Sequence, residues 1–389
     1  MSSQVENPDY LSRQLITYLG NKRSLLGNIG LAVEQVKARL GKTKLRVFDA
    51  FSGSGVVSRY LKAHAEYLVS NDLEDYAAVT SRCYLRNKSN VDRQSLLKLV
   101  DNLNAQVSSD NIQPGFIEEL YSPRDDQQIT KEDRVFYTQD NARRLDRYRQ
   151  LIDAVPSEFQ DLLLGPLLSK ASIHANTAGV FKGFYKNRQT QIGQFGGSGS
   201  DALLRIKGQI VLEPPILSRF ECDVEVLQQD ANEAARHLKN LDLAYLDPPY
   251  NQHPYGSNYF MLNLLVNYQR PVEMSRVSGI PTNWRRSGYN VRSRSLRLFQ
   301  ELIETLDAKF LLISFNNEGF ISPQEMRAML NRLGSVNVLE TKYNAFRGSR
   351  NFDRRAIHVM EQLFMVERGS VRRASRTSTC RELACNSLE

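Results

Sequence analysis

Residues 45–55 read Leu45-Arg46-Val47-Phe48-Asp49-Ala50-Phe51, followed by Ser52-Gly53-Ser54-Gly55. The first seven residues are mostly apolar, which predicts a short buried strand, and the glycines after them predict a tight turn. A helical pattern begins near Val56. A strand, a glycine turn and a helix open a βαβ unit, so this stretch predicts an α/β fold.

The same rhythm returns on both sides of a long interruption. Further strands are predicted at residues 67–70, 224–227, 241–246 and 310–315, and together they would form a parallel, Rossmann-like sheet. Between residues 88 and 220 the rhythm gives way to mixed helical and glycine-rich polar sequence. We therefore expect the first part of the sheet domain at 1–87, an inserted domain at 88–220, the second part of the sheet domain at 221–367 and a disordered basic tail at 368–389.

The charge distribution indicates a polyanionic partner. The chain has 389 residues and a formal net charge of +8. Basic residues are concentrated in the segments 165–220, 276–300 and 342–355, and the second of these holds six arginines and no acidic residue. A single basic run is a solvated surface about as often as a binding site, but three such runs favour nucleic acid.

The composition argues against several other classes of protein. No stretch approaches the run of about 20 apolar residues that a membrane span requires, and the first ten residues are polar, so we expect no membrane partner, no signal peptide and a cytoplasmic location. The four cysteines are widely scattered, which predicts free thiols, and His174 has no neighbouring ligand cluster. No metal site is expected.

Ligands of such sheets bind at the carboxyl ends of the strands, where the strand order reverses. The turn at 52–55 lacks the third glycine of a dinucleotide fingerprint and the lysine of a phosphate-binding loop, which disfavours a nicotinamide or ATP site. Asp72 ends the second strand and could accept hydrogen bonds from both ribose hydroxyls, although a helix cap is the alternative. Asp230, after a later strand, could accept from an adenine amino group. These features predict a nucleoside pocket.

The most informative stretch is Asp247-Pro248-Pro249-Tyr250, which follows the strand at 241–246. Prolines have a fixed φ and no N–H, so their carbonyls are held in set directions. The Asp247 carboxylate and the Pro248 carbonyl could accept both protons of a nucleobase amino group and free its lone pair for attack, while Tyr250 stacks on the base. A base in a duplex would first have to be flipped out. The alternative is an ordinary turn that contains two prolines by chance.

Five features in this order resemble the alpha-group DNA adenine-N6 methyltransferases, which use S-adenosylmethionine. They are Tyr18-Leu19-Gly20-Asn21-Lys22, the glycine turn, Asp72, the tetrapeptide at Asp247 and the strand end Ser314-Phe315-Asn316-Asn317-Glu318-Gly319. The resemblance covers most of residues 15–366 and implies a Rossmann-like methyltransferase sheet whose insertion recognises the target. It also implies a cofactor site formed by Tyr18, Lys22, Asp49, Phe51, Gly53, Gly55, Asp72 and Asp230. Within it, Tyr18 would pack on the methionine part, Phe51 and the glycines would lie beneath that part, Asp72 would bind the ribose, and Asp247 would contact both cofactor and base.

Two basic segments are candidates for contacts with double-stranded DNA. Lys182, Lys186 and Arg188 belong to or follow a stretch that combines lysines with aromatic and small residues, and Arg285 and Arg286 follow Trp284 in the segment after Tyr250. The implied function is site-specific methylation of adenine N6, with a possible cognate restriction endonuclease and a monomeric or weakly dimeric enzyme. Methylation of cytosine N4 or of an RNA base, and a non-catalytic DNA-binding subunit, remain the alternatives.

Overall fold

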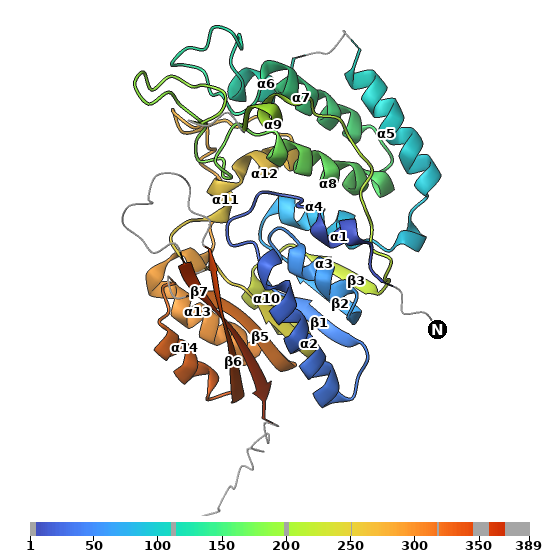
Figure 1. Cartoon of the computed structure of the whole chain (residues 1–389), viewed down its shortest axis with the longest axis vertical. Helices are drawn as coiled ribbons and strands as arrows, with labels where there is room; N and C mark the ends of the chain where they lie inside the picture. Colours follow the sequence, from blue (N-terminus) through green and yellow to red (C-terminus); the bar gives the residue numbers. More distant parts are fainter. Residues whose placement is uncertain are drawn as a thin grey trace, which may run out of the picture.

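The chain forms a seven-stranded sheet with helices on both faces and a further group of helices beyond one end of the strands (Figure 1). The computed structural model describes residues 5–109, 114–197, 202–249, 251–316, 319–344 and 358–369. The strand order is β3-β2-β1-β4-β5-β7-β6. The bounds are β1 Leu45–Asp49, β2 Ala65–Asn71, β3 Asp223–Leu227, β4 Leu241–Leu246, β5 Ala308–Asn316, β6 Gly334–Asn344 and β7 His358–Arg368.

The strands predicted from the sequence are all present, and the pairs that β1 to β5 form with one another are parallel. The parallel expectation is incomplete, because β7 runs antiparallel to β5 and to β6. β6 and β7 were not predicted from the sequence. The sheet and its helices confirm the α/β, Rossmann-like fold class.

Two helical layers cover the sheet, one on each face, so its strands are buried on both sides. Alternate residues of one strand face opposite sides: Val47 packs with α2 and α3, and Phe48 packs with α10. The helices α13 and α14 extend the second layer over β5 and β7. These helices are α2 Leu26–Leu40, α3 Val56–Lys62, α10 Ala231–His237, α13 Arg292–Thr305 and α14 Pro323–Leu330.

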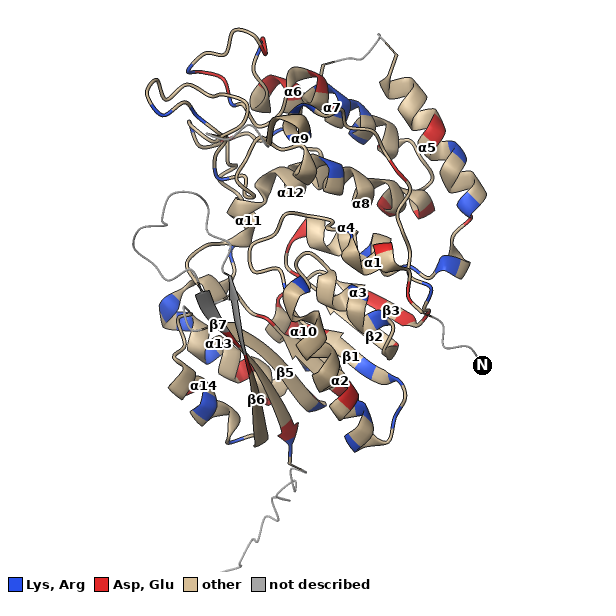
Figure 2. Cartoon of the chain, in the orientation of Figure 1, with Lys and Arg blue, Asp and Glu red and all other residues tan. Residues whose placement is uncertain are grey.

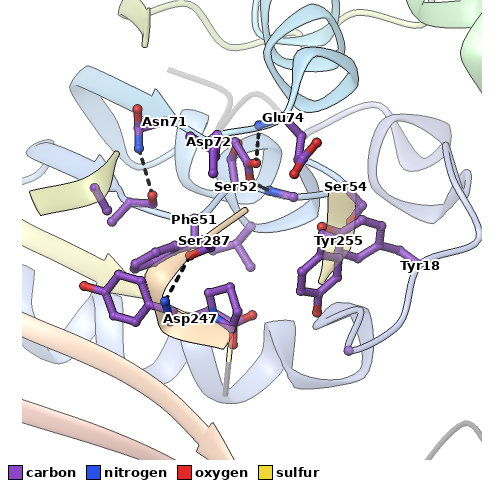
Figure 3. A pocket seen from close by; sticks show the side chains of 18 of the residues that line it. Tyr18, Phe51, Ser52, Ser54, Asn71, Asp72, Glu74, Asp247, Tyr255 and Ser287 are labelled. Carbon is purple, nitrogen blue, oxygen red and sulfur yellow. Dashed lines mark hydrogen bonds between the residues drawn. The ribbon is translucent and has the colours of Figure 1, made fainter. Parts of the chain in front are cut away.

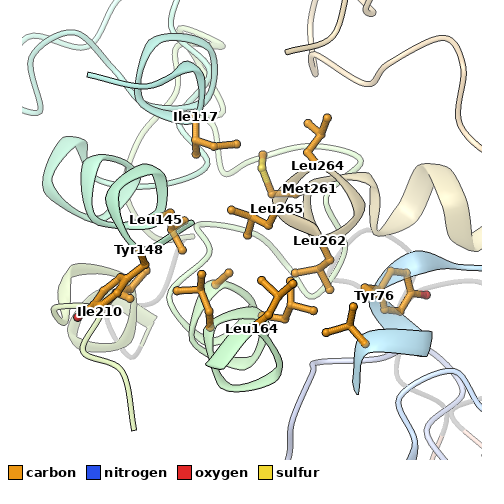
Figure 4. Packing of buried hydrophobic residues seen from close by; sticks show 14 of the residues in the cluster. Tyr76, Ile117, Leu145, Tyr148, Leu164, Ile210, Met261, Leu262, Leu264 and Leu265 are labelled. Carbon is orange, nitrogen blue, oxygen red and sulfur yellow. The ribbon is translucent and has the colours of Figure 1, made fainter. Parts of the chain in front are cut away.

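A further group of helices lies beyond the carboxyl edge of the sheet and has its own apolar core. It comprises α5 Arg93–Val107, α6 Phe116–Tyr121, α7 Gln139–Asp153, α8 Ser157–Ile173 and α9 Leu203–Lys207. α4 Asp75–Tyr84 connects the group to the sheet, since Tyr76 belongs to the same core (Figure 4). The short helix α1 Pro8–Ser12 places Tyr10 in this core as well.

The helical group also includes a segment that follows β4 in the sequence. α11 Tyr255–Asn258 leads into α12 Phe260–Asn267, whose residues Met261, Leu262 and Leu265 are buried between α6, α7 and α8 (Figure 4). α12 is apolar on most of its circumference, so it is stable only inside a core. The chain therefore passes through the helical group twice, at 93–207 and again at 255–267.

Short 3-10 turns complete the described structure, at Arg23–Leu25, Lys88–Asn90 and Gly288–Asn290. Residues 370–389, which make up almost all of the expected basic tail, lie outside the described residues, and Arg368 is the last residue of β7. Among the described residues, no helix has the length and apolar character needed to cross a membrane.

Candidate active site

A cleft of about 870 Å³ opens at the carboxyl ends of β1, β2 and β4 (Figure 3). The strand order reverses between β1 and β4, which is where ligands of such sheets bind. Several of the predicted residues line this cleft: Tyr18, Lys22, Phe51, Gly53, Asp72, Asp230, Asp247 and Pro249.

The glycine turn forms the floor of the cleft. Gly53 and Gly55 have φ values of +51° and +74°, which side-chain-bearing residues rarely adopt. A Cβ atom on Gly53 would also lie 2.9 Å from the ring of Tyr18. Glycine is therefore needed at position 53 for both conformation and space, whereas Gly55 is needed for the turn that begins α3.

Asp72 connects the turn to the end of β2. Its Oδ2 accepts from the backbone N–H of Gly53 at 2.7 Å, and its Oδ1 accepts from that of Glu74 at 3.0 Å (Figure 3). Burial raises the pKa of Asp72, and these backbone hydrogen bonds act in the opposite direction. The carboxylate thus fixes the shape of the floor and, with Glu74, forms an acidic wall.

Aromatic rings form the wall that contains Tyr18. This ring stacks nearly parallel to those of Tyr255 and Tyr259, with centroid distances of 5.0 and 4.8 Å. The backbone N–H of Leu19 donates to the Tyr259 hydroxyl at 2.8 Å, and the Tyr255 hydroxyl donates to the Leu19 carbonyl at 3.2 Å. The N-terminal segment is therefore fixed against α11 and α12.

Asp247 stands at the carboxyl end of β4 and forms an ion pair with Lys22, with Oδ1 and Nζ 3.1 Å apart. The same ammonium group lies 3.1 Å from Oε1 of Glu361 on β7. Burial raises the pKa of Asp247 to about 6, while Lys22 lowers it and Glu361 raises it. Pro248 is buried, and Pro249 lines the cleft.

Two further acids lie beneath or beside the cleft. Asp49 is fully buried and accepts from the Ser58 hydroxyl at 2.5 Å, and burial raises its pKa to about 7. Burial also raises the pKa of Glu74 to about 7, and this carboxylate accepts from Nδ2 of Asn263 at 2.6 Å. Asp49 does not line the cleft; it lies beneath the turn, where it accepts from Ser58 of α3.

The charge of the cleft suits a cationic ligand. Its lining holds the acids Asp72, Glu74, Asp230 and Asp247, against the cations Lys22 and Arg285. The face of a tyrosine ring also attracts a cation. The acidic lining, the aromatic wall and the glycine floor together fit a nucleoside that carries a positively charged centre.

Arg285 lies at the rim of the cleft. Its guanidinium forms an ion pair with Asp75 at 2.8 Å and donates to the Leu73 carbonyl at 3.0 Å. The guanidinium of Arg286 lies 4.3 Å from the ring centroid of Trp284. Asp230 accepts from the backbone N–H of Asn232 at 2.9 Å and so caps α10, while it also lines the cleft.

The remaining predicted basic residues do not line the cleft. Lys182, Lys186 and Arg188 belong to the loop after α8, and Lys182 and Arg188 are exposed. This loop contacts the segment after α12, since the Ser278 hydroxyl donates to the Lys182 carbonyl at 2.8 Å. Figure 2 shows lysines and arginines on the loops beside the helical group and on α13. Tyr250 lies outside the described residues.

Sequence reasoning missed several residues of the cleft, namely Glu74, Tyr255, Ser287, Tyr289 and Asn290. Glu74 could have been found, because it follows Asp72 by two positions at the same strand end. Tyr289 is buried and its hydroxyl donates to Asn232 at 2.7 Å, a contact that no local pattern indicates. The segment 285–290 thus forms one wall of the cleft.

A sheet of this strand order, with a glycine turn and an Asp-Pro-Pro loop at its reversal point, places the protein in the class of Rossmann-like methyltransferases. Comparison with known proteins refines this class. The chain belongs to the family of D12 class N6 adenine-specific DNA methyltransferases, whose profile matches residues 18–329. This match confirms the family expected from the sequence, and members of this family generally depend on S-adenosylmethionine.

Three relatives illustrate the similarity. The type II methyltransferase M.NlaIII of Neisseria lactamica is 27% identical over 361 residues, which cover 91% of this chain and 99% of the relative. M.CviAII of Paramecium bursaria Chlorella virus 1 is 28% identical over 340 residues, covering 85% and 93%. The modification methylase StsI of Streptococcus sanguinis is 25% identical over 371 residues, covering 90% of this chain but 52% of the relative.

Proposed function

We propose that this protein transfers a methyl group from S-adenosylmethionine to N6 of a flipped-out adenine at a specific site in double-stranded DNA. The observation that carries the proposal is the Lys22–Asp247 ion pair at the cleft above the glycine turn. This pair joins Lys22, proposed for the cofactor site, to Asp247, proposed to contact the target base. The type II methyltransferases and modification methylases among its relatives support a place in a restriction-modification system.

Several features of the cleft support S-adenosylmethionine as the cofactor. Tyr18 and the acidic lining would face its sulfonium centre, the backbone of Gly53 would lie beneath the methionine part, and Asp72 or Glu74 would accept from the ribose hydroxyls. Asp230 lines the cleft and has the chemistry to accept from the adenine amino group. When bound, the cofactor supplies an electrophilic methyl group on sulfur.

Asp247 and the loop after it would prepare the target base. The carboxylate of Asp247 and the carbonyl of Pro248 would accept from the two N6 protons, which directs the nitrogen lone pair away from the ring. The same carboxylate would stabilise the positive charge that develops on N6 during attack. We also propose that Tyr250 stacks on the base. Catalysis would then rest on positioning and electrostatics, without a covalent enzyme intermediate.

The helical group and its loops would bind the DNA around the flipped base. Residues 88–220 are proposed to form the target-recognition region, and the exposed Lys182 and Arg188, with Lys186 on the same loop, would contact phosphates. The loop segment after α12 is held against this region through Ser278 and Lys182, so it would share the interface.

The test is transfer of a labelled methyl group, followed by mapping of the product. The purified protein is incubated with methyl-labelled S-adenosylmethionine and genomic DNA, and the modified base is identified by nucleoside mass spectrometry and single-molecule sequencing. We expect N6-methyladenine at one position of a fixed sequence. Label in N4-methylcytosine or only in RNA would contradict the proposal, and binding of DNA without any transfer would favour a non-catalytic subunit.

A further inference from the structure

We propose that Glu361 is a positioning residue of the methyl-transfer site, because it holds the Lys22 ammonium group in the place from which Lys22 orients Asp247. The inference rests on the proposed function and assigns a role to a residue outside all the sequence motifs. Glu361 belongs to β7, next to β5 in the sheet and far along the chain from both Lys22 and Asp247.

The ammonium group of Lys22 lies between two carboxylates, one in the core and one at the cleft. Lys22 Nζ is 3.1 Å from Glu361 Oε1 and 3.1 Å from Asp247 Oδ1. The side chain of Glu361 is 1% exposed and that of Lys22 4%, whereas that of Asp247 is 18% exposed. Glu361 therefore anchors the lysine from the interior, and Asp247 receives its other side at the cleft.

Glu361 is itself fixed by the sheet. Its Oε1 also accepts from the hydroxyl of Ser314 at 2.6 Å, and Ser314 is buried on β5. Its backbone pairs with Asn316 of β5, so neither end of the side chain is free to move far. The Oε2 atom has no hydrogen-bond partner among the described residues.

Burying these charged groups lowers the stability of the fold, which favours a role for them at the site. A buried carboxylate loses hydration, and a hydrophobic replacement of a buried ion pair is often no less stable. A lysine side chain has four flexible carbons, so one partner alone would leave its ammonium group poorly placed. With two carboxylates on one lysine, the cluster keeps a net negative charge beside the place proposed for the sulfonium centre.

The test compares Glu361→Gln with wild type, with Glu367→Gln as the matched control. Glu367 is on the same strand but is partly exposed and pairs with Arg39 at the surface. Glutamine keeps the size of the side chain and an oxygen for Ser314, but it removes the charge that holds Lys22. We expect kcat to fall by about 10- to 100-fold, while KM for DNA and for the cofactor changes by less than about threefold. Glu361→Asp should recover part of the rate.

A second readout does not depend on turnover. Glu361→Gln removes a charge that raises the pKa of Asp247, but if it also releases Lys22 it removes the larger lowering effect of that ammonium group, so the pH at which Asp247 titrates should rise. Carbon-13 NMR of aspartate-labelled protein measures this midpoint, with Asp247→Asn to assign the signal. Wild-type kcat in a folded Glu361→Gln, or a midpoint that falls or stays unchanged, would overturn the inference. An inactive wild-type protein would overturn the proposed function instead, and the NMR midpoint would still decide the role of Glu361.

Discussion

The ammonium group of Lys22 lies 3.1 Å from the carboxylate of Asp247, although Lys22 precedes the first strand and Asp247 follows the fourth. This contact joins the motif that ends at Lys22 to the motif that begins at Asp247, although the two motifs lie far apart in the sequence. Because both residues of the pair line the cleft, a substitution of either one changes the environment of the other.

Asp247→Asn should abolish most methyl transfer. The amide keeps the shape of the carboxylate but removes the charge that pairs with Lys22 and stabilises the developing charge on N6, so kcat should fall by about 10²- to 10³-fold. DNA affinity, measured by fluorescence anisotropy, should stay within about twofold of wild type. Asp101→Asn on the exposed surface of α5 is the control. Near-normal turnover of Asp247→Asn would refute the assigned role.

The rate should depend on pH through Asp247. Its pKa is raised to about 6, and the ionised form is the stronger acceptor, so kcat/KM should fall as the pH drops below about 6. Lys22 lowers this pKa, so Lys22→Met should move the acid limb of the profile to higher pH. Initial rates between pH 5 and 8.5 test both statements. A rate that stays constant down to pH 5 would exclude this titration as the cause.

The sequence predicted those parts of the site in which neighbouring residues are also neighbours in space. Asp72 and Asp247 each follow a strand directly, and the turn at Gly53 lies a few residues after β1, so a short pattern was enough to place them. Glu361 and Tyr289 reach the site only through the pairing of β7 and the packing of the segment after α12. Similarly, the basic run around Arg285 gave no sign of its ion pair with Asp75, which depends on how distant segments pack.

Gly53→Ala should weaken cofactor binding. The new methyl group would meet the Tyr18 ring at 2.9 Å, and the positive φ would cost about 1–2 kcal/mol for a residue with a Cβ atom. Calorimetric titration with S-adenosylmethionine should show an affinity at least about tenfold lower. Gly27→Ala in α2 is the matched control, because nothing lies within 4 Å of its added Cβ. Equal affinities for both variants would contradict a floor formed by the turn.

Asp49 should make the ligand-free protein less stable at high pH. Its pKa is raised from 3.8 to about 7 by burial, so the folded state binds a proton more tightly than the unfolded state. The stability from this proton is complete below about pH 4 and is lost as the pH rises through about 7. Asp49→Asn should therefore raise Tm at pH 8.5 by at least about 2 °C and flatten its pH dependence between 6 and 8.5. A lower Tm at pH 8.5 in this variant would reverse the assigned sign.

DNA affinity should fall steeply with salt. The logarithm of the binding constant should decrease with the logarithm of salt concentration by about 0.9 for each phosphate contact. Changing Lys182, Lys186 and Arg188 one at a time to Gln should reduce this slope by about one unit each, whereas Arg332→Gln in the turn after α14 should not. Anisotropy titrations at several salt concentrations give the slopes. A shallow slope in wild type would discount these residues.

The strand β7 has a consequence for biosynthesis. It lies between β5 and β6, so β6 has no strand to pair with until the ribosome has released a later part of the chain. Because β7 also carries Glu361, a nascent chain that stops short of it would lack both the closing strand and the anchor of Lys22. Only fully translated molecules would then have the complete site, and prematurely terminated products would be targets for proteolysis instead of partly active enzymes.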